Sequence, residues 1–306
     1  MSSGTWSDKV SALTLLVQES PLHTTKSFEN LLGLSAKHSR TQALMALGAL
    51  KDLLGQGVVL PGNRKLRTFT KQPGLVAGFR RVETWSAKDL LPNGIEKVHL
   101  ITWAYEDWLK GMYFEMLKVL ERWCNDEVEF ARVRAVTYVW ELLKEKPEQE
   151  ENLLRLLVNK LGDTSKKIAS RASHLLLQLQ VTHPSMKSVI VNAVESEVLL
   201  RPGQSSHAKY YAVITLNQTI LRTSDPDVAN KLLDVYFSLF VTILNRTKHD
   251  KLGKGGESQS KKRKRYTPAT PANEEKSEQE LEDKIIAQVL TGINRAFPFS
   301  KTDGGT

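Results

Sequence analysis

Three features of the sequence predict an all-α fold in which helices pack on one another. Apolar residues recur at three- and four-residue spacing, the period of a helix buried along one face, through most of the chain. Short polar links join the successive helical patterns, and one of these patterns recurs after 37 residues. The composition, 41% hydrophobic and 25% charged residues in a chain of 306, is that of a folded protein.

The N-terminal part, residues 7–54, predicts three consecutive helices. The first follows Ser7, a candidate N-cap, and ends at Pro21, because a proline cannot continue a helix. The second helix is expected over 25–34, and the third, with five leucines on one stripe, over 41–54. Three helices with short links favour helix packed on helix.

The helical pattern breaks between about residues 55 and 94. Within this stretch, residues 61–82 hold six basic residues and no acidic one, and Pro73, Gly74 and Gly78 argue against regular structure. We therefore expect a long irregular basic loop, and such loops are usually functional or disordered. Its cations, the candidate RNA-contacting residues, are Arg64, Lys65, Arg67, Lys71, Arg80 and Arg81.

The recurring pattern lies between residues 126 and 200. Arg134 and its helix match Arg171 and its helix, and Pro147 matches Pro184, each at an offset of 37 residues. A second helix follows in each copy, and two helix pairs at this period indicate a HEAT- or armadillo-like helical-repeat solenoid. Neighbouring repeats must stack, because a single repeat cannot bury its own apolar face.

The C-terminal part changes composition sharply. A weaker third copy begins at Ser206 and a helix is expected over 227–244, after which residues 246–267 are basic and 268–283 are acidic. High charge with few apolar residues favours disorder. The predicted organisation is a helical-repeat domain over 1–250 with the irregular basic loop at about 55–94, a disordered charged linker over 251–280, and a terminal helix of the same array over 281–306.

The charge of the chain favours a polyanionic partner. A formal net charge of +9 is typical of nucleic-acid binding, although basic tails alone can produce it. One run of five cations in the linker predicts recognition by a nuclear import receptor, the alternative being a solvated charge run. The residues of this candidate nuclear-localisation signal are Lys261, Lys262, Arg263, Lys264 and Arg265.

Two interpretations of the basic loop stay open. Its cations either neutralise RNA phosphates, which would make binding strongly salt-dependent, or lie against an acidic helix face of the same chain. Phe69, the aromatic residue within the loop's basic part, is a weak candidate for stacking on a base.

Motifs of known catalytic sites are absent from the sequence. It contains no GxxxxGK[ST], GxSxG or HExxH, and its seven histidines are scattered without the spacing of a metal site. Cys124 is expected to be a buried structural thiol, and His174 a core or boundary residue. No apolar run approaches the ~20 residues of a membrane helix. We predict an intracellular, non-enzymatic protein without a cofactor and without membrane contact.

Eight stretches, in order along residues 7–300, carry a family resemblance: residues 42–54, 60–67, 158–163, 166–176, 183–187, 209–212, 229–232 and 290–300. Together they resemble the CCAAT-binding factor family, also known as the nucleolar complex protein one family.

This resemblance implies an assembly factor of the large (60S) ribosomal subunit that acts in the nucleus and nucleolus on early pre-ribosomal particles. The implied partners are a second nucleolar complex protein and pre-rRNA, and the family has no known catalytic residues. A vertebrate relative was described as a CCAAT-box transcription factor, so a CCAAT-box DNA-binding regulator is the alternative. Relatives continue beyond the motif at 290–300, so the chain is expected to be a truncated central portion.

Other classes of protein fit the sequence less well. Nothing in it resembles the recognition helix of a helix-turn-helix, a zinc finger or a basic zipper, which argues against sequence-specific DNA reading. An import-type or vesicle-coat solenoid shares the predicted fold but leaves the basic loop and the run 261–265 unexplained. The sequence therefore favours a ribosome-assembly scaffold that holds proteins on its helices and touches rRNA through basic loops.

Overall fold

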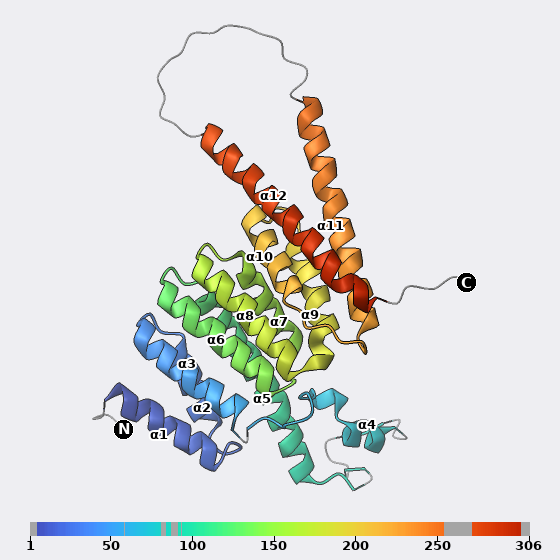
Figure 1. The fold of residues 1–306 in the computed structure, drawn as a ribbon. Helices are drawn as coiled ribbons and strands as arrows, with labels where there is room; N and C mark the ends of the chain where they lie inside the picture. The colour runs from blue at the N-terminus through green and yellow to red at the C-terminus, as the bar shows by residue number, and fades with distance from the viewer. Residues whose placement is uncertain are drawn as a thin grey trace. The chain divides into compact units, whose positions relative to one another are not determined.

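The computed structural model describes residues 5–57, 59–80, 84–86, 91–92, 94–253 and 271–300, with the backbone alone over 246–253 and 271–278 (Figure 1). Helices dominate the described residues, and no strand occurs among them, which confirms the predicted all-α class. The chain divides into two compact units, Met1–Leu156 and Leu157–Thr306, which are described separately.

Helices of the first unit pack through stripes of leucine. α1, α2 and α3 pack on one another, α3 packs on α6, and α6 on α5. Leu31, Leu47 and Leu50 are fully buried in this core. Because each helix buries one face only, these contacts decide which side chains stay outside. The helices are α1 (Trp6–Glu19), α2 (Thr25–Ser35), α3 (Arg40–Gly55), α4 (Pro73–Phe79), α5 (Lys97–Cys124), α6 (Glu129–Glu145) and α7 (Glu150–Asn159), whose last residues belong to the second unit.

The first helix begins earlier than the sequence predicted. Thr5, and not Ser7, is the N-cap of α1: its side chain accepts a hydrogen bond from the Asp8 N–H at 3.3 Å. The Asp8 carboxylate in turn accepts from the Thr5 hydroxyl at 2.7 Å and from the Thr5 N–H at 2.9 Å, and these two hydrogen bonds lower the pKa of Asp8. The reciprocal capping box satisfies two backbone donors and therefore prevails over a lone serine.

The basic connection is more regular than predicted, because it contains a 3₁₀ turn at Phe69–Lys71 and the helix α4. Pro73 occupies the first turn of α4, where backbone N–H groups have no acceptor within the helix. The missing N–H of proline therefore costs no helical hydrogen bond. A Cβ on Gly74 would lie 2.6 Å from Cζ2 of Trp103, and one on Gly78 would lie 2.5 Å from Cδ1 of Ile95. The expectation of an irregular stretch was therefore wrong for residues 69–71 and 73–79, where both glycines allow α4 to pack closely.

Helix bounds in the structure reproduce the 37-residue offset. α6 begins at Glu129 and α8 at Lys166, and both contain 17 residues. α7 begins at Glu150 and α9 at Lys187, which is the same offset. The second unit comprises α8 (Lys166–Thr182), α9 (Lys187–Val194), a π-helical turn (Glu195–Leu199), α10 (Ser206–Asn217), α11 (Pro226–Gly253) and α12 (Pro271–Ala296), preceded by the last part of α7.

The two helices that flank the charged linker are longer than predicted. α11 extends to Gly253 and α12 begins at Pro271, so part of the stretch expected to be disordered is helical. Residues 271–280 hold four glutamates, one glutamine, one lysine and one alanine, which are strong helix formers that offset the lack of apolar residues. The rest of the linker, residues 254–270, lies outside the described residues.

α12 closes the second unit by packing on both α10 and α11 (Figure 1). Asn217, at the end of α10, donates from Nδ2 to the carbonyl of Gln288 at 2.9 Å. The buried Tyr236 of α11 donates its hydroxyl to Oδ1 of Asn217 at 2.7 Å, and burial raises the pKa of Tyr236. Gly292 lies against this pair, within the family-like stretch 290–300, and a Cβ there would lie 2.5 Å from Cζ of Tyr236.

This close approach predicts that Gly292→Ala destabilises the chain. The added methyl overpacks the junction of three helices, at a cost of about 1–3 kcal/mol. Gly111→Ala is the matched control, because Gly111 is a helical glycine of α5 with no atom within 4 Å of the added Cβ. That control gains about 0.5–1 kcal/mol from helix propensity. Urea unfolding followed by far-UV circular dichroism measures both, and equal stabilisation by the two changes would contradict the packing at Gly292.

Candidate nucleic-acid interface

The predicted RNA-contacting cations lie mainly on one extended stretch, residues 60–72, which we call the basic segment. Two buried leucines, Leu60 and Leu66, anchor it to the first unit with 3% and 5% of their surface exposed. Its 3₁₀ turn contacts α5. Carboxylates of α5 and of the turn before α7 bind both its backbone and its side chains.

Glu106 of α5 forms the centre of this contact. Its carboxylate accepts from both terminal nitrogens of Arg64, the second at 3.2 Å. It also accepts from the backbone N–H of Arg67 at 2.8 Å and from Nε2 of Gln72 at 3.0 Å. Burial opposes ionisation, but these hydrogen bonds together hold the pKa of Glu106 below its ordinary value. Glu106 is therefore an anion in the folded protein, and its carboxylate fixes the conformation of the basic segment.

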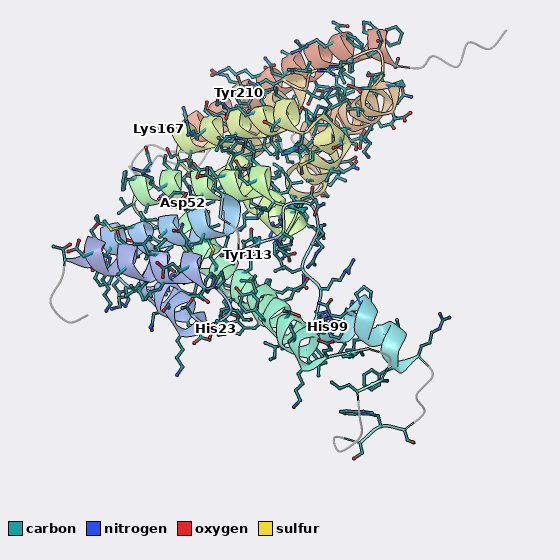
Figure 2. All side chains as sticks on the ribbon, turned by 90° about the horizontal axis from the view of Figure 1, so that it is seen from below. His23, Asp52, His99, Tyr113, Lys167 and Tyr210 are labelled. Atoms are coloured by element: carbon teal, nitrogen blue, oxygen red, sulfur yellow. The ribbon has the colours of Figure 1, made fainter. Side chains whose placement is uncertain are left out.

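Glu148 makes a second, buried contact. Its side chain is 3% exposed, and it accepts from the Leu66 N–H at 2.5 Å and from Nζ of Lys110 at 2.9 Å. Lys110 also donates to the Leu66 carbonyl at 2.9 Å, so one ion pair satisfies both backbone groups of this residue. Tyr113, one helical turn from Lys110 on α5, is also buried (Figure 2). Burial and then the charge of Glu148 raise the pKa of Tyr113.

Two weaker contacts complete the attachment. Nζ of Lys65 lies 3.4 Å from Oε2 of Glu150, at the start of α7. The Phe69 N–H donates to Oδ1 of Asp107 at 3.2 Å. Phe69 is half-buried, so its ring is only partly available for stacking on a base.

The six candidate cations thus fall into two groups. Arg64 and Lys65 pair with carboxylates of their own chain, which was one of the two interpretations of the basic loop. Arg67, Lys71 and Arg80 are exposed, and within the described residues none of their side chains has an acidic partner. Arg81 and the candidate localisation signal, Lys261 to Arg265, lie outside the described residues.

Other residues singled out in the sequence have simpler positions. Cys124 is fully buried, as predicted, at the end of α5. His174 is exposed on α8, so its predicted place in the core or at its boundary was wrong. In the part of the chain that the structure describes, no three His, Cys, Asp or Glu side chains gather as metal ligands. No described helix has the length and apolarity needed to cross a membrane.

The carboxylates that hold the basic segment were missed by the sequence analysis. Glu106 lies 42 residues from Arg64, and Glu148 lies 82 residues from Leu66. No local spacing rule relates residues so far apart. The adjacent acids Glu106 and Asp107 on one helix were the available signal, since an acidic helix face was already one expected counterpart of the loop.

Fold and site together define an all-helical protein whose outer surface carries a basic segment, held along its backbone by the protein's own carboxylates. No family model matches the chain. Over its full length it is 53% identical to Ribosome biogenesis protein NOC1 of Chaetomium thermophilum, of which it covers 30%. It is 37% identical over 99% of its length to human CCAAT/enhancer-binding protein zeta, of which it covers 25%. It is 32% identical over 79% of its length to Nucleolar complex protein 1 of Drosophila melanogaster, of which it covers 20%.

The chain therefore belongs to the family of these proteins, the CCAAT-binding factor or nucleolar complex protein one family, which the sequence resemblance had indicated. It spans about a third or less of the length of the relatives it matches. The fungal and the fly relatives are named for ribosome biogenesis and for a nucleolar complex, and neither name denotes an enzyme.

The lowered pKa of Glu106 predicts a pH-dependent contribution to stability. Its anion is favoured in the folded state, so its contribution is present above the ordinary pKa and is lost as the pH falls through the lower, folded value. Glu106→Gln is therefore less stable than the wild type at pH 7, and the difference narrows toward pH 3.

Tryptophan fluorescence during urea unfolding measures this difference in the first unit, because all six tryptophans lie within residues 1–156. Glu115→Gln is the control, since Glu115 lies on the same helix, is 49% exposed and pairs only with Lys118 among the described residues. A gap between wild type and Glu106→Gln that is constant from pH 7 to pH 3 would contradict the contact.

Proposed function

We propose that the chain is part of a ribosome-assembly scaffold of the large (60S) subunit, which acts on early pre-ribosomal particles through protein–protein and pre-rRNA contacts. The observation that carries the proposal is the 53% identity, along the whole chain, to a protein named for ribosome biogenesis. The 37-residue offset between helix pairs supports a HEAT- or armadillo-like repeat, a class whose stacked helices offer extended surfaces to partners.

The basic segment supports the contact with pre-rRNA. Glu106 and Glu148 bind backbone N–H groups of the segment, so its conformation is set before any ligand arrives. A fixed conformation lowers the entropic cost of binding RNA. Arg67 and Lys71 on this segment, and Arg80 after α4, are then the cations available to neutralise phosphates.

The further partners and the location follow from the family and the sequence. The protein partner is a second nucleolar complex protein, which the name of the fly relative supports. The run from Lys261 to Arg265 binds a nuclear import receptor, whose acidic groove pairs with consecutive cations. The proposed location is accordingly the nucleus and, within it, the nucleolus.

The second candidate function is that of a CCAAT-box DNA-binding regulator, favoured by the name of the human relative. Base readout in the major groove needs several side chains presented from one helix or ribbon. The exposed cations of the basic segment lie outside such a helix and suit backbone contacts instead. A gel-shift competition between a CCAAT duplex and a scrambled duplex separates the two functions, and a clear preference for CCAAT would favour the regulator.

Sedimentation tests the proposed function in cells. The tagged full-length protein that contains this chain is expected to sediment with pre-60S particles and to leave those fractions when the particles are dissociated by high salt. Purification of the tagged protein without pre-rRNA and without other assembly factors would contradict the scaffold.

Salt-dependent binding tests the role of the exposed cations. The triple variant Arg67→Ala, Lys71→Ala and Arg80→Ala is expected to bind single-stranded RNA more weakly than the wild type. Its plot of log affinity against log salt flattens by about 0.7 for each phosphate that the variant no longer neutralises. Fluorescence anisotropy at several salt concentrations measures the slope. A control variant removes three exposed lysines elsewhere, Lys9, Lys26 and Lys284, and equal slopes for the two triple variants would contradict the assignment.

Import is tested by replacing all five residues from Lys261 to Arg265 with alanine in the chain fused to a fluorescent protein. Nuclear accumulation is expected to fall, because the receptor's acidic groove is left without the cations that it pairs with. Microscopy gives the nuclear-to-cytoplasmic ratio, and an unchanged ratio would contradict the proposed signal.

A further inference from the structure

Two helices of the second unit, α8 and α10, lie side by side and run in the same direction. Ser173, at the middle of α8, accepts from Oγ1 of Thr215 near the end of α10 at 2.8 Å, and it donates to Oε1 of Gln218, the C-cap of α10, at 3.3 Å. Near their N-termini, the charge of Lys166 acts on the ring of His207. Figure 2 labels Lys167 and Tyr210 on these neighbouring helices.

The outward surfaces of these helices combine cations with aromatic rings. Lys166, Arg171 and His174 are exposed along α8, and three half-buried rings lie on the outward side of α10. The ring centroids of His207 and Tyr211 are 4.9 Å apart, and those of Tyr210 and Tyr211 are 5.8 Å apart. We call this surface the α8/α10 face, made of Lys166, Arg171, His174, His207, Tyr210 and Tyr211.

Acidic residues are missing from both helices along their full lengths, Lys166–Thr182 and Ser206–Asn217. Most other helices of the chain mix the two charges, and α12, which packs on α10, carries Glu280, Glu282 and Asp283. The cations of α8 and α10 therefore have no acidic residue on their own helices to offset their charge. Lys166 stands in the first turn of α8, where the helix dipole disfavours a cation, so it is poorly placed to stabilise the fold.

From this juxtaposition we propose that the α8/α10 face is a second RNA-binding surface, which takes a short single-stranded segment by stacking bases on Tyr210 and Tyr211 and pairing phosphates with Lys166 and Arg171. The inference rests on the proposed contact with pre-rRNA, and it assigns that contact to residues outside the basic segment. Aromatic rings interleaved with cations are the usual composition of surfaces that bind single-stranded nucleic acid.

Single-stranded RNA fits the face better than an acidic protein segment does. A run of acidic side chains needs cations only, and it gains nothing from a line of rings. Burial and then the charge of Lys166 lower the pKa of His207, so this residue is a neutral ring at pH 7 and adds to the aromatic part of the face. Three rings on α10, with Lys166 next to His207 and Arg171 exposed further along α8, therefore offer partners to both bases and phosphates.

Substitution of the rings is the direct test. In the full chain, the double variant Tyr210→Ala and Tyr211→Ala is expected to bind an oligouridylate at least about tenfold more weakly, because the bases no longer have rings to stack on. The double variant Tyr210→Phe and Tyr211→Phe keeps the stacking surface and is expected to bind within about twofold of the wild type. Circular dichroism confirms that each variant is folded.

Substitution of the charges provides an independent test that leaves the rings in place. Lys166→Gln with Arg171→Gln changes exposed side chains only and is expected to flatten the salt dependence of oligouridylate binding. The control Lys284→Gln removes an exposed lysine of α12 in the same unit and is expected to leave the slope unchanged.

The outcomes separate this inference from the proposed function. If the wild-type chain binds no RNA, the proposed pre-rRNA contact and the α8/α10 face both fail. If RNA binding is weakened by the Arg67, Lys71 and Arg80 variant but not by changes at the α8/α10 face, only the proposal that this face binds RNA is overturned. A poly-glutamate peptide is the remaining comparison. If it competes with RNA, and if its binding is weakened by the tyrosine-to-alanine variant as much as RNA binding is, the face belongs to an acidic protein instead.

Discussion

Burial of apolar helix faces is the constraint on which the rest of the structure depends. A helix with one leucine stripe gains stability only when a neighbour covers that stripe, at roughly 25 cal/mol for each Å² removed from water. In the first unit α3 is covered in this way by α1, α2 and α6, and in the second unit α10 is covered by α8 and α12. Once the stripes are paired, the remaining faces must be polar, and these faces are what the protein presents to partners. The proposed contact with RNA therefore depends on which cations the packing leaves outside.

The first unit divides its cations between structural and available roles. Arg64 and Lys65 are engaged by Glu106 and Glu150, while the backbone around them is held by Glu106 and Glu148. Exposed ion pairs contribute little to stability, so the buried carboxylate of Glu148 is the stronger of these attachments. A basic segment that is held in one conformation by its own acids binds a polyanion with less ordering than a free loop does. Arg64 and Lys65 thus bear out the interpretation in which acids of the same chain bind the loop, while phosphate contact by the exposed cations stays a proposal.

The sequence predicted what depends on local periodicity and composition. Apolar spacing predicted the helices, and the match of Pro147 with Pro184 predicted an offset that the helix starts reproduce. It did not predict α4, because glycine and proline disfavour an isolated helix and the packing of Gly74 on Trp103 is visible only in three dimensions. It did not predict the carboxylates that hold the basic segment, because those contacts join residues far apart in the chain. The same limit applies to the α8/α10 face, whose residues come from two helices that are separated along the chain by α9 and a π-helical turn.

The central claim is that exposed basic surfaces of this chain contact precursor rRNA of the large subunit. Crosslinking in living cells, followed by sequencing of the bound RNA and mass spectrometry of the crosslinked peptides, tests it most directly. The account predicts crosslinks to large-subunit pre-rRNA at peptides that contain Arg67, Lys71 or Arg80, and at peptides of α8 or α10. RNA recovery no greater than that of an uncrosslinked control, or crosslinks confined to peptides outside these surfaces, would contradict it.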